Sequence, residues 1–167
     1  MKTTLLSFLL LFATALCSAE NSEPVDVAFT GEGASPIASG VAVPAGRSYF
    51  WTSGTVPSLV KKDGATIYER YGDTYVQGVS CLKNIEKVLA DQGLTLKDVV
   101  YLRVYVVADA AKGSRPDFAG WFKAYGEFFN TATNPVKTAR STVGVSALVS
   151  PDWLIEIEAV AVRPTKK

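Results

Sequence analysis

The sequence contains no histidine and little sulfur. Its 167 residues include 2 cysteines and 1 methionine. Without an imidazole, a serine or cysteine triad, histidine acid/base chemistry and a zinc site with histidine ligands are all excluded. Any reaction must use Arg, Lys, Asp or Glu side chains, hydroxyl groups, backbone groups or bound water. We therefore expect no metal site and no cofactor.

The chain also lacks a strong excess of charge of either sign. It has 17 basic and 16 acidic residues and a formal net charge of +1. Nucleic-acid binding normally needs a clear excess of basic residues. We therefore expect no nucleic-acid partner, and RNA cleavage is the least favoured type of activity. Hydrophobic residues make up 48% of the chain, which is long enough for one domain with a substantial core.

Residues 1–19 have the pattern of an export signal. Lys2 is followed by an apolar run and then by small residues at Cys17, Ser18 and Ala19. We expect cleavage before Glu20 and a periplasmic or secreted protein with no membrane attachment. Lipidation of Cys17 is the alternative, but the preceding Leu16 stands where the lipid-attachment motif prefers a small residue. After cleavage Cys81 would be the single cysteine, without an internal disulfide, and its helical pattern favours a buried structural role.

The remainder divides into an N-terminal extension with an edge strand, residues 20–39, and one domain, residues 40–167. Turn residues 44–46 between two apolar runs predict a hairpin. Hydrophobic periodicity predicts two helices, one from Asp73 to Gly93 and one after Ser114, with Ser114 and Asp117 as capping residues. The predicted strands are residues 41–43, 47–52, 99–107, 140–148 and 154–163.

This order of elements, ββ(β)αβαββ, predicts an α+β domain with a mixed sheet. Two crossover helices cover only one face of such a sheet. In the second predicted strand, Tyr49 and Trp51 lie on one face and Phe50 on the other, so large side chains occupy both faces. The uncovered face predicts self-association of the chain. The second helix carries an aromatic stripe, which we interpret as core packing (Phe118, Trp121, Phe122, Tyr125, Phe128 and Phe129).

Arg140 is the main candidate for ligand binding. Strand alternation places it on one face with Thr142, and Val143 on the other. If the valine face packs under the helices, Arg140 points to the uncovered face, where subunits would meet. A guanidinium there needs an anionic partner, and its planar fork matches a carboxylate.

The last predicted strand carries Glu156 and Glu158 on one face beside valines. Spacing alone leaves two interpretations open. One glutamate forms a structural ion pair with Arg140 or Arg103, which is the more frequent case, or one holds a water near a ligand as a general acid/base. The strand end around Ser53 and Gly54 is small enough for a ligand to approach, although a simple turn is the more common explanation.

These segments together resemble the Rid family (YjgF/RidA, endoribonuclease L-PSP-like). Trp51–Pro57 resembles the family's "TSGQIP" strand end, and residues 77–93 resemble its first helix. The more specific part is residues 138–148, followed by Ile155-Glu156-Ile157-Glu158-Ala159-Val160-Ala161. The similarity covers about residues 40–164.

The resemblance implies a chorismate-mutase-like fold and a homotrimer with clefts between subunits. It aligns Arg140 with the carboxylate-binding arginine, Glu156 with a water-associated glutamate, and Gly54 and Tyr125 with residues that line the cleft. In active members, water attacks an imine such as that derived from 2-aminoacrylate and releases ammonia and a 2-keto acid.

Several positions depart from the family pattern. Thr142 replaces a common cysteine, although its carbonyl remains available to orient water. Phe122 stands where a polar residue is frequent, Thr55 replaces a glutamine, and the aromatic residue before the first hairpin is missing near Ser39. The alternative function is therefore a noncatalytic exported protein that binds small carboxylates.

Overall fold

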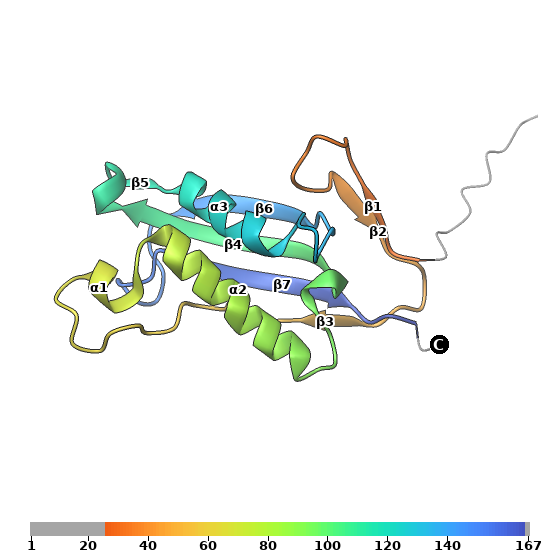
Figure 1. Ribbon diagram of the computed structural model, residues 1–167, viewed down its shortest axis with the longest axis horizontal. Helices are drawn as coiled ribbons and strands as arrows, with labels where there is room; N and C mark the ends of the chain where they lie inside the picture. The colour runs from red at the N-terminus through yellow and green to blue at the C-terminus, as the bar shows by residue number, and fades with distance from the viewer. Residues whose placement is uncertain (1–25, 166–167) are drawn as a thin grey trace, which may run out of the picture.

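A computed structural model describes residues 26–165, which form a twisted five-stranded main sheet with two long helices on one face and a separate two-stranded sheet (Figure 1). The predicted signal segment, residues 1–19, lies outside the described residues. Strands β3, β7, β4 and β5 follow one another across the sheet, and β6 also pairs with β4. Only the β4–β6 pair is parallel. The bounds are β3 Tyr49–Trp51, β4 Val99–Asp109, β5 Arg115–Pro116, β6 Ala139–Val145 and β7 Ile155–Val162. The predicted mixed α+β domain is confirmed.

The two long helices are α2 (Thr74–Ala90) and α3 (Phe118–Phe128), and both begin at an aspartate cap. The Asp73 side chain accepts a hydrogen bond from the Val76 N–H, and the Asp117 side chain accepts one from the Gly120 N–H. The predicted capping role of Ser114 is wrong, because Ser114 lies before β5 with a positive φ of 55°. Within residues 26–165, the helices are all too short or too polar to span a membrane.

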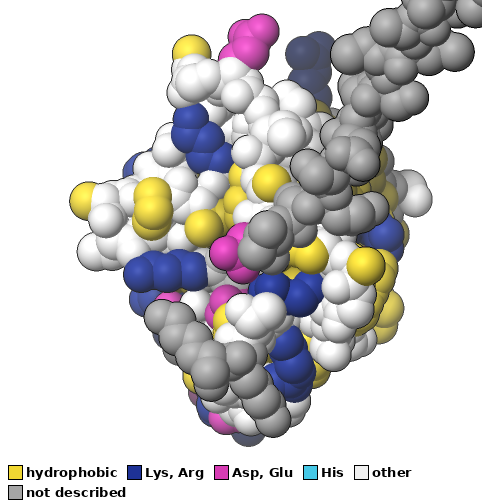
Figure 2. Space-filling model, turned by 90° about the vertical axis from the view of Figure 1, so that its right-hand side faces the viewer, with side chains coloured by type: hydrophobic (Ala, Val, Ile, Leu, Met, Phe, Trp, Pro, Cys, Tyr) yellow, Lys and Arg dark blue, Asp and Glu magenta, His cyan; other side chains and the backbone are white. Residues whose placement is uncertain are grey.

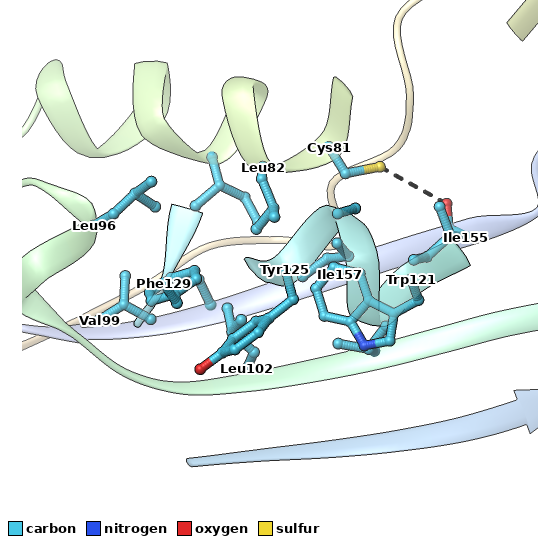
Figure 3. Close-up of a cluster of buried hydrophobic side chains, with 14 of the residues drawn as sticks. Cys81, Leu82, Leu96, Val99, Leu102, Trp121, Tyr125, Phe129, Ile155 and Ile157 are labelled. Carbon is cyan, nitrogen blue, oxygen red and sulfur yellow. Dashed lines mark hydrogen bonds between the residues drawn. The ribbon is translucent and has the colours of Figure 1, made fainter. Parts of the chain in front are cut away.

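The core lies between these helices and the sheet. Trp121 and Tyr125 of α3, with Phe129 just after its end, pack beside Leu82 of α2 and Ile157 of β7 (Figure 3). The free Cys81 is fully buried beside the Ile155 carbonyl, and burial raises the pKa of its thiol. The predicted burial of Cys81 is confirmed, and Phe50 likewise packs against this core.

The predicted hairpin of residues 41–43 and 47–52 is wrong. Strand β2 (Gly40–Ala42) pairs with β1 (Ala28–Thr30) in a separate two-stranded sheet, whereas β3 pairs with β7. The extension supplies a competing partner for β2, and a turn pattern alone does not specify which neighbour a strand pairs with. The edge strand expected in residues 20–39 therefore exists, but it is not part of the main sheet.

The small sheet covers one end of the face opposite the helices. Val100, Val160 and Val162 of the main sheet form a second apolar cluster there. Val27, Phe29, Val41 and Val43 pack against this cluster. The extension therefore shields the region where β4 begins and β7 ends. Tyr49, Trp51 and Val143 remain exposed on the same face.

A short helix, α1 (Ile67–Tyr71), precedes α2 and was not predicted. Its position depends on tertiary contacts. Arg70 donates two hydrogen bonds of 2.6 Å to the Asp152 carboxylate and one of 2.8 Å to the Gly64 carbonyl. The Tyr68 hydroxyl donates to the buried Asp109 carboxylate at the end of β4. Five residues are too few for a helix to be stable alone, so periodicity cannot reveal it.

The ion pair of Arg70 and Asp152 predicts an acid-dependent loss of stability. Hydrogen bonds from Arg70 lower the pKa of the Asp152 carboxyl. Asp152 therefore stabilises the fold above its unfolded pKa of about 4, and this contribution disappears as the pH falls through the lower folded value. In Asp152→Asn, the free energy of unfolding should be smaller than in the wild type at pH 7. The two proteins should converge by about pH 2.

Urea unfolding at a series of pH values measures this difference. Asp63→Asn is the matched control, because Asp63 is exposed and belongs to none of the ion pairs among the described residues. A constant gap between wild type and Asp152→Asn across the pH range would contradict the assignment.

Candidate functional site

Arg140 lies on the helix-covered side of β6, and the prediction that it points to the uncovered face is wrong. It pairs with Leu102 of β4, whose side chain is part of the helix-covered core. Val143 lies on the opposite side and is 43% exposed. Valines that face another subunit and valines that face a core have the same sequence pattern, so the alternation gave the correct two sets but the wrong assignment of faces.

The aromatic rings of α3 surround the Arg140 guanidinium. Its Cζ lies 4.3 Å from the ring centre of Tyr125, 4.6 Å from that of Phe122 and 5.6 Å from that of Trp121. Contacts of this type contribute about 0.5–2 kcal/mol each. Burial lowers the pKa of Arg140, but an arginine pKa is so high that the group stays charged. The aromatic stripe is therefore both core and site: Trp121, Tyr125 and Phe129 are buried, as predicted, but the stripe also binds Arg140.

The Arg140 guanidinium lacks an acidic partner among the described residues. Nη1 is buried and has no hydrogen-bond partner among residues 26–165, and the ion pairs found in this part of the chain do not include Arg140. The side chain lines a hollow of about 310 Å³. That volume is suited to a small organic molecule. The other lining residues are Pro36, Phe122, Tyr125, Gly126, Phe129 and Asn130.

Thr142 follows Arg140 on the same side of β6. Its hydroxyl oxygen accepts a hydrogen bond of 3.2 Å from the Trp121 indole N–H. This contact links α3 to the edge strand and fixes the indole that lies beside the guanidinium. Thr142 therefore contacts the support of the Arg140 site, and its hydroxyl is already engaged.

Glu156 and Gly54 lie together on the other side of the sheet. Glu156 pairs with Tyr105 of β4, on the face opposite Leu102. A Cβ added to Gly54 would lie 1.8 Å from the Glu156 Oε1 atom. Because the φ of Gly54 is not in the left-handed region, glycine is needed here for space rather than for backbone geometry. The Glu156 carboxylate thus rests against the backbone at Gly54, and it belongs to none of the ion pairs within residues 26–165.

The neighbouring Glu158 takes the structural role that spacing left open. Its carboxylate binds Arg103 at 2.7 Å, and the Tyr105 hydroxyl donates to it at 3.4 Å. The prediction of a structural ion pair is therefore confirmed for Glu158 with Arg103. Neither Glu156 nor Arg140 has an ion-pair partner in the part of the chain that the structure describes.

The predicted site residues form two groups within one chain. Arg140, Thr142 and Tyr125 lie on the helix side of the sheet, whereas Glu156 and Gly54 lie on the other side. Sequence reasoning missed Pro36 and Asn130, which line the hollow at Arg140. Pro36 comes from the extension, and its carbonyl accepts a hydrogen bond of 3.3 Å from the Tyr125 hydroxyl. Nothing local in the sequence marks that contact.

The chain is similar to proteins of a known family. The family described as Endoribonuclease L-PSP matches residues 35–163. A RutC family protein of Pyrococcus horikoshii is 33% identical over 139 residues, which cover 83% of this chain and 98% of that protein. A RutC family protein of Synechocystis is 37% identical over 94 residues, which cover 56% of this chain and 65% of that protein. The chain therefore belongs to the endoribonuclease L-PSP family, which includes the Rid and YjgF proteins.

Solved structures agree with this membership. The Rid family protein YyfB of Yersinia pestis matches with a TM-score of 0.62 and 27% identity, covering 81% of this chain and 98% of that protein. The YjgF protein of E. coli matches with a TM-score of 0.55 and 33% identity, covering 73% of this chain and 85% of that protein. E. coli TdcF, solved with bound serine, matches with a TM-score of 0.56 and 28% identity, also covering 73% and 85%. The resemblance to the Rid family is confirmed.

The contact between Gly54 and Glu156 predicts the effect of a single methyl group. In Gly54→Ala, the new Cβ should move the Glu156 carboxylate by about 1.5 Å or more, the shift that restores a normal contact. Only the flexible end of a side chain has to move, so the loss of stability should stay below about 1 kcal/mol.

A crystal structure and urea unfolding of Gly54→Ala measure the two effects. Gly33→Ala is the matched control, since a Cβ there has no neighbour within 4 Å. An unmoved Glu156 carboxylate, or a collapse in stability, would show that the space at Gly54 serves another purpose.

Proposed function

We propose that this protein binds the carboxylate of a small imine through Arg140 and hydrolyses its carbon–nitrogen double bond in a cleft completed by a second copy of the chain. The observation that carries this proposal is the unpaired, largely buried guanidinium beside a hollow of about 310 Å³. Membership of the family supports the same type of ligand. The structure of E. coli TdcF with bound serine shows that one relative accepts a small carboxylate-containing molecule.

The first step of the argument is the cost of an unpaired charge. A partly buried cation without a counter-ion loses hydration that its aromatic neighbours replace only in part. A carboxylate that enters the hollow supplies the missing charge and accepts two parallel hydrogen bonds from the guanidinium fork. The rings of Phe122 and Tyr125 lie against the guanidinium and restrict the orientation of that fork. Arg140 is therefore prepared for an anion before the anion arrives.

The second step concerns Glu156, which lies on the opposite face of the sheet from Arg140. A single copy does not place both side chains around one small ligand. A second copy does, if the exposed face with Tyr49, Trp51 and Val143 packs against it. We propose the homotrimer that the family resemblance implies, with Arg140 of one copy and Glu156 of the next in each cleft.

The chemistry then follows from the two groups. Glu156 accepts a proton from water as the water oxygen attacks the imine carbon, and passes it to the imine nitrogen, which gives a carbinolamine. The carbinolamine hydroxyl then gives its proton to that nitrogen by way of Glu156 as the carbon–nitrogen bond breaks, which releases ammonia and leaves a 2-keto acid. Arg140 holds the adjacent carboxylate throughout, so the reacting carbon stays next to the water.

The family is named for an endoribonuclease, but the charge distribution of this chain favours a small ligand. At the end of the molecule with β1, β2 and the C-terminus, basic, acidic and hydrophobic side chains are mixed on the visible surface (Figure 2). RNA binding generally requires a continuous basic surface. The net charge of +1 supports the same conclusion.

Export is also part of the proposal and rests on residues 1–19 alone. Cleavage before Glu20 would leave the extension, residues 20–39, as the start of the mature protein. Mass spectrometry of the protein recovered from cell fractions tests this. A mature mass that begins at Met1, or one that includes lipid on Cys17, would overturn it.

Replacement of Arg140 tests ligand binding and turnover separately. Arg140→Met removes the charge but keeps most of the volume, so ammonia release from a freshly generated 2-imino acid should fall by at least about 100-fold. Arg140→Lys keeps the charge but not the planar fork, so its rate of ammonia release should lie between that of the wild type and that of Arg140→Met. The free energy of unfolding should change little, because the lost contacts with the aromatic rings are offset by the removal of an unpaired, partly buried charge.

Ammonia release, thermal shift with pyruvate, and urea unfolding give the three readouts. Equal ammonia release by wild type, Arg140→Met and buffer would exclude the deaminase. If pyruvate still raised the melting temperature of the wild type only, a binding protein without turnover would be the correct description. Equal shifts in both proteins would exclude Arg140 as the ligand-binding group.

The shared cleft predicts complementation between two inactive variants. Arg140→Met and Glu156→Gln each inactivate all clefts in a homotrimer, but mixed trimers contain clefts with an intact Arg140 from one copy and an intact Glu156 from another. Random mixing leaves about a quarter of the clefts intact, so refolding the two variants together should restore about a quarter of the wild-type activity.

Light scattering of each sample confirms that trimers have formed. Refolding each variant alone is the control and should restore none of the activity. Trimers of the mixture without activity would show that both residues must come from the same copy, and monomers would contradict the shared cleft itself.

A further inference from the structure

The walls of the hollow at Arg140 are mostly apolar. Asn130 and Arg140 are the polar side chains at its edge other than the Tyr125 hydroxyl. That hydroxyl already donates to the Pro36 carbonyl. A ligand held by its carboxylate therefore extends along Phe122, Phe129 and Pro36, which offer no side-chain hydrogen bonds.

Phe122 is the distinctive part of this wall. It lies on α3, one turn before Gly126, and its ring is stacked over the guanidinium at 4.6 Å. The side chain is 47% exposed, whereas its neighbours Trp121 and Tyr125 are buried. A large exposed ring next to an unpaired cation gains favourable burial only when something apolar covers it. The part of a ligand beyond its carboxylate is in position to do so.

Another part of the wall, Pro36, comes from the loop between β1 and β2, and that loop is anchored. The Lys137 ammonium donates to the Gly33 carbonyl at 2.6 Å, and the Ala38 N–H donates to the Lys137 carbonyl at 3.2 Å. Both contacts join the loop to the segment that leads into β6. Pro36 is therefore held in place beside the hollow. A fixed apolar wall discriminates between ligands better than a mobile one, because less order is lost on binding.

We infer that this site selects carboxylates with a bulky apolar substituent, aromatic or branched aliphatic, and discriminates against small or hydroxylated ones. This inference rests on the proposed function only in that Arg140 binds the carboxylate. An apolar substituent gains from burial against Phe122 and Pro36. A hydroxyl group placed there loses its hydrogen bonds to water without replacement. Among imines, the substrates would then be those derived from large apolar amino acids.

The test compares phenylacetate with glycolate, two carboxylates that differ in the substituent. Isothermal titration should show that the wild type binds phenylacetate at least about tenfold more tightly, the preference that a few buried methylene groups give. Phe122→Asn should reduce this preference to less than about threefold, because the affinity for phenylacetate falls by a larger factor than the affinity for glycolate. Phe122→Leu, which keeps an apolar wall, should retain most of it.

Two controls separate the possible failures. Val88→Asn makes an apolar-to-polar change at a similarly exposed position on α2, away from the hollow, and should leave both affinities unchanged. Thermal unfolding verifies that each variant is folded. Equal affinities of the wild type for the two ligands, or an unchanged preference in Phe122→Asn, would overturn this inference while Arg140-dependent binding stands. Affinities that do not change in Arg140→Met would overturn the proposed function as well.

Discussion

The stacking of the Arg140 guanidinium on the aromatic rings of α3 is the interaction on which the site depends. It keeps a cation at the edge of the sheet without a carboxylate from the fold, so the charge remains available for a ligand. The same rings form part of the core, and the Trp121 indole is tied to β6 through Thr142. The contacts that pack α3 on the sheet therefore also hold the rings that surround Arg140 in the candidate site. A site built in this way is as rigid as the core that supports it.

The sheet separates the two candidate groups, so the proposed homotrimer would bring them together as well as cover apolar surface. Helices α2 and α3 close one face, and the β1–β2 sheet covers one end of the other. Glu156 rests against Gly54 on that second face, out of the helix-side hollow. Its neighbour Glu158 is neutralised by Arg103, so only one carboxylate in this strand is left without an ion pair. Glu156 and Glu158 thus differ because only Glu158 has a cation, Arg103, opposite it.

The sequence was sufficient for most of the fold, but not for the directions in which the candidate site residues point. Periodicity located α2, α3, β4 and β7 because each is long enough to show a repeat. It failed for α1, whose five residues depend on Arg70 and Asp152, which are far apart in the chain. It also failed for β2, because a strand edge accepts either of two partners. Arg140 was placed on the wrong face of the sheet, since apolar residues at an interface resemble those in a core.

The anchored loop at Pro36 has an evolutionary consequence. It lies outside the main sheet and the helix pair, yet it forms a wall of the hollow. Substitutions or insertions in such a connecting segment cost little folding free energy compared with changes in the core. Members of one lineage can therefore diversify the molecules they accept by altering this loop, while the scaffold beneath it is inherited unchanged.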